Sequence, residues 1–542
     1  MELNEKSLTE DRSSFEAAGY RLPGYDRKKV RENTLKSPEW IHFGAGNIFR
    51  AFQANVLQEL LDKGLMDTGL IAAEGYDCEI IDKSYRPHDN LSILATLKAD
   101  ATVEKTVVGS IAESLVLDRE RGEDFARLRE IFASPSLKMA SFTITEKGYA
   151  VTDASGSYTA AVKADLEAGP DSAQSYLGKV ISLLFERYTA GGLPIAMVSM
   201  DNCSHNGDKL KNAVYTFAEA WSSNGLADSG FYDYVRDDGR VSFPWSMIDK
   251  ITPRPDGRVE EMLAKDDIAG LDPVVTSKNT WVAPFVNAEE CQYLVIEDSF
   301  PAGKLPLDKA GVIYTDRATV DKVEKMKVCT CLNPLHTTLA VFGCILGYSL
   351  ISEEMKDPDL KKLVEKIGYT EGLPVVVDPG IIDPKSFIDE VVNVRIPNPF
   401  MPDTPQRIAC DTSQKLPIRF GETIKAYAGR DDLNVSDLKY IPLVYAAWLR
   451  YLMAVDDDGR AFEPSPDPLL DECMEYVSSY SLSAEDKDLS GLDALLSNDR
   501  IFGVDLCGAG MADRVKELFS MMSRGPGAVR RTLKEMLQQD NG

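Results

Sequence analysis

The sequence has few of the residues from which metal sites and disulfide frameworks are built. It contains only 4 histidines in 542 residues, and none lies in an HxH or HExxH pattern or near cysteines at zinc-binding spacing. The 9 cysteines are an odd number without a CxxC pair, which is typical of a reducing compartment. We therefore expect neither a bound metal nor a structural disulfide.

Long apolar runs and net positive charge are also absent. No uninterrupted apolar stretch reaches the roughly 20 residues that cross a bilayer, and residues 1–37 lack the apolar centre of a signal peptide. A formal net charge of −26 repels phosphate backbones and anionic lipids. We expect a cytoplasmic protein with a small-molecule substrate and no nucleic-acid or membrane partner. An anionic substrate would need local cations, and the oligomeric state stays open.

The length and the apolar pattern predict an α/β protein with more than one domain. At 542 residues the chain can form two to three hydrophobic cores. Short apolar runs alternate with amphipathic stretches in the first half, as in a parallel sheet with crossover helices, and long helical patterns dominate from about residue 300. We predict an N-terminal arm at 1–37, a Rossmann-type dinucleotide-binding domain at 38–300 and a mainly helical substrate-binding and catalytic domain at 301–542.

A candidate dinucleotide site follows the first predicted strand, residues 40–43. Gly44 and Gly46 match the first two glycines of a dinucleotide fingerprint, one for the tight turn and one for close approach of a pyrophosphate. Phe49 and Arg50 stand where a small residue is usual, so a plain strand-to-helix turn is the alternative interpretation.

An acidic residue follows the second apolar run. Glu74 lies where a carboxylate binds the ribose hydroxyls of NAD and repels the 2′-phosphate of NADP. Its distance from Gly46 is longer than usual, and Asp77 or a merely solvated acidic turn is the alternative. The sequence thus predicts NAD as the cofactor.

Several segments, in order, resemble those of the mannitol dehydrogenase family, the polyol-specific long-chain dehydrogenases. They cover roughly residues 38–510 and are GAGNIFRAFQ (44–53), SFTITEKGY (141–149), SMDNCSHNGDKLKNAV (199–214), SMIDKITPRP (246–255), NPLH (333–336), RIPNP (395–399), SQKLPIR (413–419) and RIFGVDL (500–506). The resemblance implies a zinc-independent, NAD-dependent oxidoreductase. It also implies cofactor contacts from Gly44, Gly46, Asn47, Phe49, Arg50, Glu74 and Glu146.

Oxidation of a secondary alcohol needs a base and donors that stabilise the reacting oxygen. The family uses a lysine base, two asparagines and a substrate-binding histidine, and the resemblance assigns these roles to Lys327, Asn202, Asn333 and His336. Lys327 lies six residues before Asn333, one more than in the family pattern, so Lys325 is the alternative base. Pro334 predicts that one helix stops near Cys331 and that a new helix starts at Pro334. Such a break would accommodate the extra residue.

Each of these residues also has a purely structural interpretation. Asn202 could be a turn residue and Asn333 only a helix cap, while a lone histidine in an apolar helix is often a core residue. Lys327 could lie on a solvated helix face. Cys329 and Cys331 have no third soft ligand nearby in sequence, so buried thiols are favoured over a metal site.

Substrate binding is predicted for Asp249, which would accept hydrogen bonds from hydroxyls, and for Arg395 and Lys415, which would bind a carboxylate. The family arginine of the ITP segment is Lys250 here, so no role is carried over to it. The stretch CTCLNPLHTTLAVFGCILGY is most similar to the uronate-reducing branch, which implies interconversion of D-fructuronate and D-mannonate. Mannitol, arabinitol and tagaturonate are alternative substrates. A catalytically idle dinucleotide-binding sensor or scaffold is the hypothesis from another class.

Overall fold

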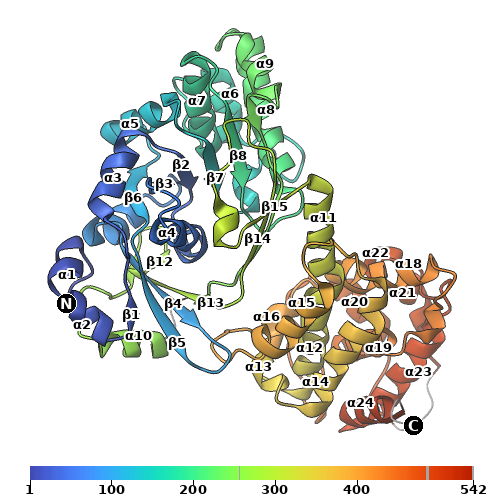
Figure 1. The fold of residues 1–542 in the computed structure, drawn as a ribbon. Coiled ribbons are helices and arrows are strands. Elements are labelled where there is room, and N and C mark those ends of the chain that lie inside the picture. Colours follow the sequence, from blue (N-terminus) through green and yellow to red (C-terminus); the bar gives the residue numbers. More distant parts are fainter. Residues whose placement is uncertain (255–256, 484–487, 540–542) are drawn as a thin grey trace. The chain divides into compact units, whose positions relative to one another are not determined.

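The computed structural model describes residues 1–254, 257–483 and 488–539 of the chain. It divides into two compact units (Figure 1). Unit 1 comprises Met1–Lys98 and Thr102–Asp321, and unit 2 comprises Lys322–Gly542 together with Ala99–Ala101.

Unit 1 is built around a six-stranded sheet in the order β6-β3-β2-β7-β8-β9. All its neighbouring strands are parallel. This is the strand order of a Rossmann fold, so the predicted α/β class is confirmed. The strands are β2 (Trp40–Phe43), β3 (Leu70–Glu74), β6 (Ile111–Val116), β7 (Met139–Phe142), β8 (Ile195–Ser199) and β9 (Val241–Ser242).

Both faces of this sheet are buried. Along β3, Ile71 and Ala73 pack into one hydrophobic cluster, and Leu70 and Ala72 pack into another. Helices α5 (Gly122–Ala133), α7 (Tyr176–Thr189) and α8 (Asn206–Ser223) contribute apolar side chains to the first cluster, and α4 (Ala54–Asp62) contributes to the second. Burial on both faces explains why the strands are nearly continuous apolar runs without alternation.

Three smaller sheets complete unit 1. Two of them have the orders β1-β5-β4-β13 and β10-β14-β15, and the third pairs β11 (Val274–Val275) with β12 (Trp281–Val282). The strands of the first two are β1 (Tyr20–Arg21), β4 (Ser92–Leu97), β5 (Val103–Val108), β10 (Ser246–Asp249), β13 (Phe285–Glu289), β14 (Tyr293–Glu297) and β15 (Ile313–Thr315).

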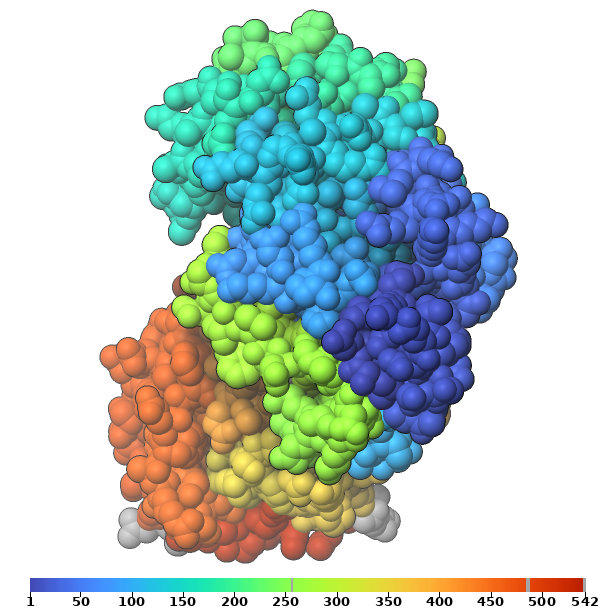
Figure 2. Space-filling model, turned by 90° about the vertical axis from the view of Figure 1, so that its left-hand side faces the viewer, coloured from blue at the N-terminus to red at the C-terminus, as the bar shows by residue number. Residues whose placement is uncertain are grey.

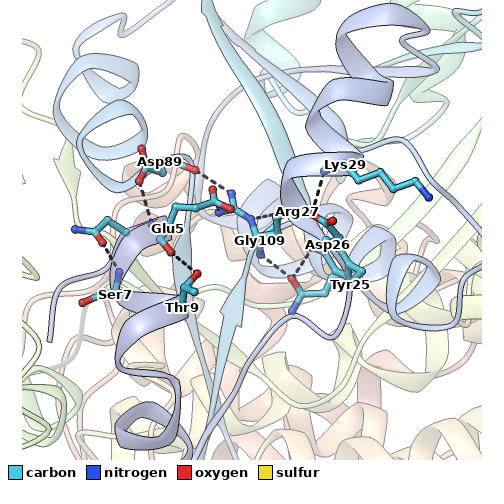
Figure 3. A network of polar contacts seen from close by, with 11 residues as sticks. Glu5, Ser7, Thr9, Tyr25, Asp26, Arg27, Lys29, Asp89 and Gly109 are labelled. Carbon is cyan, nitrogen blue, oxygen red and sulfur yellow. Dashed lines mark hydrogen bonds and ion pairs between the residues drawn. The ribbon is translucent and has the colours of Figure 1, made fainter.

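Residues 1–37 are part of unit 1. They form α1 (Glu5–Glu10), α2 (Arg12–Ala17), β1 and α3 (Arg27–Lys36). The side chain of Arg27 donates to Glu5 and to the carbonyls of Gly109 and Asp89, at 2.7, 2.9 and 2.9 Å (Figure 3). In Figure 2 this dark blue arm lies beside the green segment near residue 270, which an isolated bridge from Glu2 to Ala269 joins to it. Long-range contacts therefore order a segment whose sequence is polar.

Unit 2 is mainly helical, as predicted. From residue 322 on, the structure describes helices and no strand. Among the helices are α12 (Asn333–Leu346), α14 (Pro358–Glu365), α19 (Tyr440–Leu452) and α23 (Ala512–Met522). All 13 residues of α19 are buried, so this helix is the centre of the unit. By length and composition Arg317–Leu346 is apolar enough to cross a membrane, but 72% of its most apolar window is buried within the protein, which is typical of a core helix.

Glu354, at the end of α13 (Ile351–Glu354), is a buried acid whose two carboxyl oxygens have no hydrogen-bond partner in the described part of the chain. Burial, reinforced by the charge of Asp357, raises the pKa of Glu354 well above its usual 4.5. A folded-state pKa above the unfolded value makes stability fall as the pH rises above 4.5.

We expect Glu354→Gln to raise the melting temperature at pH 8, since glutamine needs no proton to stay neutral there. The gain should correspond to roughly 1–3 kcal/mol and disappear as the pH falls toward the ordinary glutamate range. The exposed neighbour Glu353 provides the control, and Glu353→Gln should change little. Thermal unfolding across pH 5–8 measures both variants, and a gain that is independent of pH would contradict the prediction.

Candidate active site

The candidate cofactor residues of unit 1 lie where the parallel strands end. Strand β2 has β3 on one side and β7 on the other, so the order of the strands reverses at this point. In open α/β sheets, ligands bind outside the carboxyl ends of the strands at such a switch point. Gly44 follows β2 directly, with φ +108, and a Cβ there would lie 2.3 Å from the carbonyl oxygen of Thr143. Only glycine fits this turn.

Gly46 has a different environment from Gly44. No atom lies within 4 Å of a Cβ built on Gly46, so its backbone faces open space. A helix begins at Asn47 and continues through the π-helical segment η1 (Phe49–Gln53) into α4. An open glycine before a helix N-terminus is the arrangement that accepts a pyrophosphate, so the residues present fit a dinucleotide.

Phe49 and Arg50 support this turn from inside the protein. The Phe49 ring is fully buried and stacks on His42 with 4.3 Å between ring centroids. The guanidinium of Arg50, also buried, donates to Asn47 Oδ1 at 2.9 Å and to the carbonyl of Ala283 at 2.6 Å. Both side chains therefore support the shape of the turn, and Arg50 also holds Asn47 in position.

Glu74 connects the glycine turn to the turn after β3. Its carboxylate accepts hydrogen bonds from the backbone N–H groups of Ala45, Tyr76 and Asp77 at 2.8, 2.7 and 3.1 Å, and the side chain is buried. The rival Asp77 is buried too and accepts a hydrogen bond from Thr276 Oγ1 at 2.6 Å. Glu74 thus organises the site, and its negative charge lies at the carboxyl end of β3.

Lys278 is a cation at this end of the sheet that the sequence did not indicate. Its ammonium donates to the carbonyl of Tyr76 and lies 4.2 Å from the centre of the exposed Tyr76 ring. The two residues are 202 positions apart, so no local pattern connects them.

Glu146 and Asn202 follow the next two strands, β7 and β8. Asp201 joins these strand ends, because its carboxylate accepts from the backbone N–H groups of Ile144 and Thr145, both at 2.9 Å. Thr145 has φ +65, an unusual value for a residue other than glycine and one that often occurs at functional sites. Glu146 is largely exposed and pairs with Lys209 at 3.0 Å.

Asn206 fixes the loop that carries Asn202. Its side-chain amide donates to the carbonyls of Ser199 and Ser246, at 3.3 and 3.0 Å, and also to that of Asp201. Asp201 and Asn206 were not predicted as site residues, although both belong to the DNxxxNG segment. The candidate substrate residue Asp249 is buried at the end of β10, which belongs to a different sheet from β8, the strand that precedes Asn202.

Lys327 and Lys325 have contrasting environments. Lys325 is exposed at the end of α11 (Arg317–Lys325), while the side chain of Lys327 is buried in the π-helical segment η6 (Met326–Cys331). The wider π-helical turn accommodates one additional residue. The backbone then breaks at Leu332, with φ −127 and ψ −61, and α12 starts at Asn333. The break is as predicted, although the new helix begins one residue before Pro334.

His336, in the first turn of α12, lies among positive charges. Burial is the largest cause that lowers the pKa of His336, and the charges of Arg419, Arg407, Arg395 and Lys415 contribute in that order; together they bring the pKa to about 3. We call these four residues the cationic cluster. The imidazole is therefore neutral near pH 7, and its Nε2 lies 3.4 Å from the Asp403 carboxylate.

The members of the cationic cluster are held in different ways. Arg407 forms an ion pair with Asp403, and the ammonium of Lys415 donates to the carbonyls of Ile408, at 3.1 Å, and Cys410. Arg395 is buried in η9 (Val391–Arg395). Arg407 and Arg419 were not predicted from the sequence, although Arg419 ends the SQKLPIR segment. In a chain of net charge −26, such a cluster is a local exception.

Comparisons with known proteins agree with this architecture. The family model for the mannitol dehydrogenase Rossmann domain matches residues 38–309, and the model for the mannitol dehydrogenase C-terminal domain matches residues 319–522. The chain belongs to the mannitol dehydrogenase family. The resemblance seen in the sequence motifs is thereby confirmed, and this family member is an oxidoreductase.

Individual relatives differ in substrate and cofactor. A D-mannonate oxidoreductase from Thermotoga maritima is 52% identical over 100% of both chains. A polyol:NADP oxidoreductase from Gluconobacter oxydans is 28% identical, covering 83% of this chain and 86% of its own. The solved structure of Pseudomonas fluorescens mannitol 2-dehydrogenase is a ternary complex with NAD and D-mannitol. It matches with a TM-score of 0.68 and 27% identity, covering 99% of the present chain and 100% of the mannitol 2-dehydrogenase chain.

Proposed function

We propose that this family member is an NAD-dependent fructuronate reductase, which interconverts D-fructuronate and D-mannonate. The observation that carries the proposal is the cationic cluster around His336, because a polyol has no charge that would need it and a uronate carries a carboxylate. The full-length similarity to a protein named D-mannonate oxidoreductase supports the same substrate pair.

The chain supplies the proton and the hydrogen bonds of the reaction. When bound, the nicotinamide donates or accepts the hydride at the substrate carbon. Lys327 gives a proton to the ketone oxygen during reduction, so that the ketone becomes a secondary alcohol, and takes that proton back during oxidation. Asn202 and Asn333 donate amide hydrogen bonds to the reacting oxygen, and neutral His336 binds a substrate hydroxyl.

The remaining candidates would orient the sugar acid and the nucleotide. Asp249 accepts hydrogen bonds from substrate hydroxyls, while Arg395 and Lys415 contribute positive charge toward the carboxylate. The negative charge of Glu74 favours NAD over NADP at the ribose. A cytoplasmic location, a further part of the proposal, is compatible with the 9 cysteines being free thiols.

A substrate and cofactor panel tests the proposal. The purified protein is given D-fructuronate, D-tagaturonate or D-fructose with NADH, and then D-fructuronate with NADPH. We expect the highest kcat/KM with D-fructuronate and NADH. A higher kcat/KM with D-fructose would instead favour a mannitol dehydrogenase. Tighter binding of NADPH than of NADH would refute the proposed role of Glu74. Lys278, the cation at the same end of the sheet, would then be the next residue to test for cofactor selectivity.

Activity should survive exhaustive chelation. Within the described ranges, no group of three or more His, Cys, Asp or Glu residues is arranged to hold a metal ion, and Lys327 supplies the proton in the proposed reaction. We expect less than about a twofold change in kcat after EDTA treatment and dialysis, whereas a catalytic zinc would have lowered the pKa of its bound water and be indispensable. Loss of turnover that Zn²⁺ or Mn²⁺ restores would contradict the expectation.

A further inference from the structure

Arg419 lies next to two of the proposed active-site residues. It belongs to the π-helical segment η10 (Pro417–Gly421), and its Nη1 donates a hydrogen bond to Thr337 Oγ1. That hydroxyl in turn donates to the carbonyl of Asn333 at 2.9 Å. Thr337 directly follows His336 in α12, so one hydroxyl connects the guanidinium to the turn that carries both Asn333 and His336.

The segment around Arg419 also contacts the turn of Lys327. Within unit 2, η10 packs against η6, which contains Lys327, and against α12. Among the charges that lower the pKa of His336, that of Arg419 has the largest effect. The guanidinium is therefore close to the residues that would bind the reacting end of the substrate.

The charge of Arg419 has no partner of opposite sign within the part of the chain that the structure describes. The side chain is partly buried, and among the residues that the structure describes no carboxylate forms an ion pair with it. Burial lowers the pKa of Arg419 to about 10, so it stays positive near pH 7. Arg407, by contrast, is neutralised by Asp403. A desolvated charge without a counter-ion is costly, which suggests that the counter-ion is a ligand.

The hydrogen bonds of Arg419 leave one edge of the guanidinium available. Only Nη1 is occupied, by Thr337, and the N–H groups on Nε and Nη2 have no partner among the described residues. These two nitrogens form the side-on edge that pairs with both oxygens of a carboxylate.

We propose that Arg419 binds the carboxylate of the substrate and thereby determines specificity for sugar acids over uncharged ketoses and polyols. This inference rests on the proposed function, since it assigns one residue to the recognition of the same substrate. Lysine could not replace Arg419 fully, because an ammonium lacks the planar fork.

The test compares two substrates in one variant. Arg419→Met keeps an unbranched apolar stem and removes the charged guanidinium. We expect kcat/KM for D-fructuronate to fall about 100-fold, as for the loss of charged hydrogen bonds, mainly through KM. The value for D-fructose should change less than about threefold, since fructose has no carboxylate. Arg419→Lys should be intermediate. Arg430→Met is the control, because Arg430 is exposed and paired with Asp432.

A chemical rescue separates binding from a structural role. In Arg419→Ala, added methylguanidinium should restore D-fructuronate reduction and leave D-fructose reduction unchanged. Equal losses on both substrates in Arg419→Met, or no loss on either, would overturn the inference. If Arg419→Met fails to fold, the same comparison in Arg419→Lys decides. Wild-type protein that reduces D-fructose but not D-fructuronate would refute the proposed function itself. Failure of the proposed function is thus seen in the wild type, and failure of the inference about Arg419 is seen in the variants.

Discussion

Lys327→Ala should lower turnover by about 10²–10⁴-fold, the usual contribution of a positioned acid or base, while NADH binding stays near that of the wild type. The reason is that Lys327 is buried in the π-helical turn immediately before Asn333 and His336. Steady-state kinetics with D-fructuronate measures the loss, and fluorescence titration with NADH measures binding. The pH profile of kcat should also lose the limb that the base contributes.

Lys325→Ala provides the matched control, because Lys325 is exposed on the preceding helical turn. It should keep near-normal rates. An inactive Lys325→Ala with an active Lys327→Ala would place the base two residues earlier. Full activity in both variants would mean that neither lysine is the base and would revive the hypothesis that the chain is a dinucleotide-binding sensor or scaffold.

The two fingerprint glycines should respond in opposite ways to the same added methyl group. In Gly46→Ala the new Cβ projects into open space, so we expect a normal melting temperature. It would occupy the space through which a pyrophosphate approaches, and NADH should bind at least about tenfold more weakly, or about 1.4 kcal/mol.

Gly44→Ala should instead destabilise the fold. The added Cβ meets the Thr143 carbonyl at 2.3 Å, and the φ of +108 is strained for any other residue. The positive φ costs about 1–2 kcal/mol and the overpacking about 1–3 kcal/mol. We therefore expect a loss of roughly 2–5 kcal/mol, seen as a lower melting temperature without NADH. A stable Gly44→Ala variant, or a Gly46→Ala variant that binds NADH normally, would contradict this account of the turn.

The sequence predicts most of the fold because its signals are local. The apolar run at 40–43, the glycines after it and the helix that follows are contiguous, so the first βα unit is recognisable without a structure. The π-helical segments η1 and η6 were not predicted, since one extra residue in a helical turn leaves no mark on the apolar period. The folding of residues 1–37 also escaped prediction, because it depends on Arg27 reaching Asp89 and Gly109.

Most candidate site residues could be proposed from the sequence because a motif surrounds them, as for Gly44, Asn202 and Asn333. Glu74 was proposed from its place after a strand, but its three hydrogen bonds to backbone N–H groups require the folded turn. Arg419 and Arg407 are candidate site residues because they lie near His336, which is more than 70 residues earlier in the chain. A single arginine in a sequence does not indicate such a distant neighbour.

The most direct test of the central claim is the product of D-fructuronate reduction. Purified protein is incubated with D-fructuronate and NADH, and the hexonate formed is identified by chromatography against both epimers at the new carbinol carbon. The account predicts one D-mannonate for each NADH oxidised, because one hydride adds to a single face of the ketone carbon and one proton adds to its oxygen. Absence of NADH oxidation, or formation of the other epimer, would contradict it.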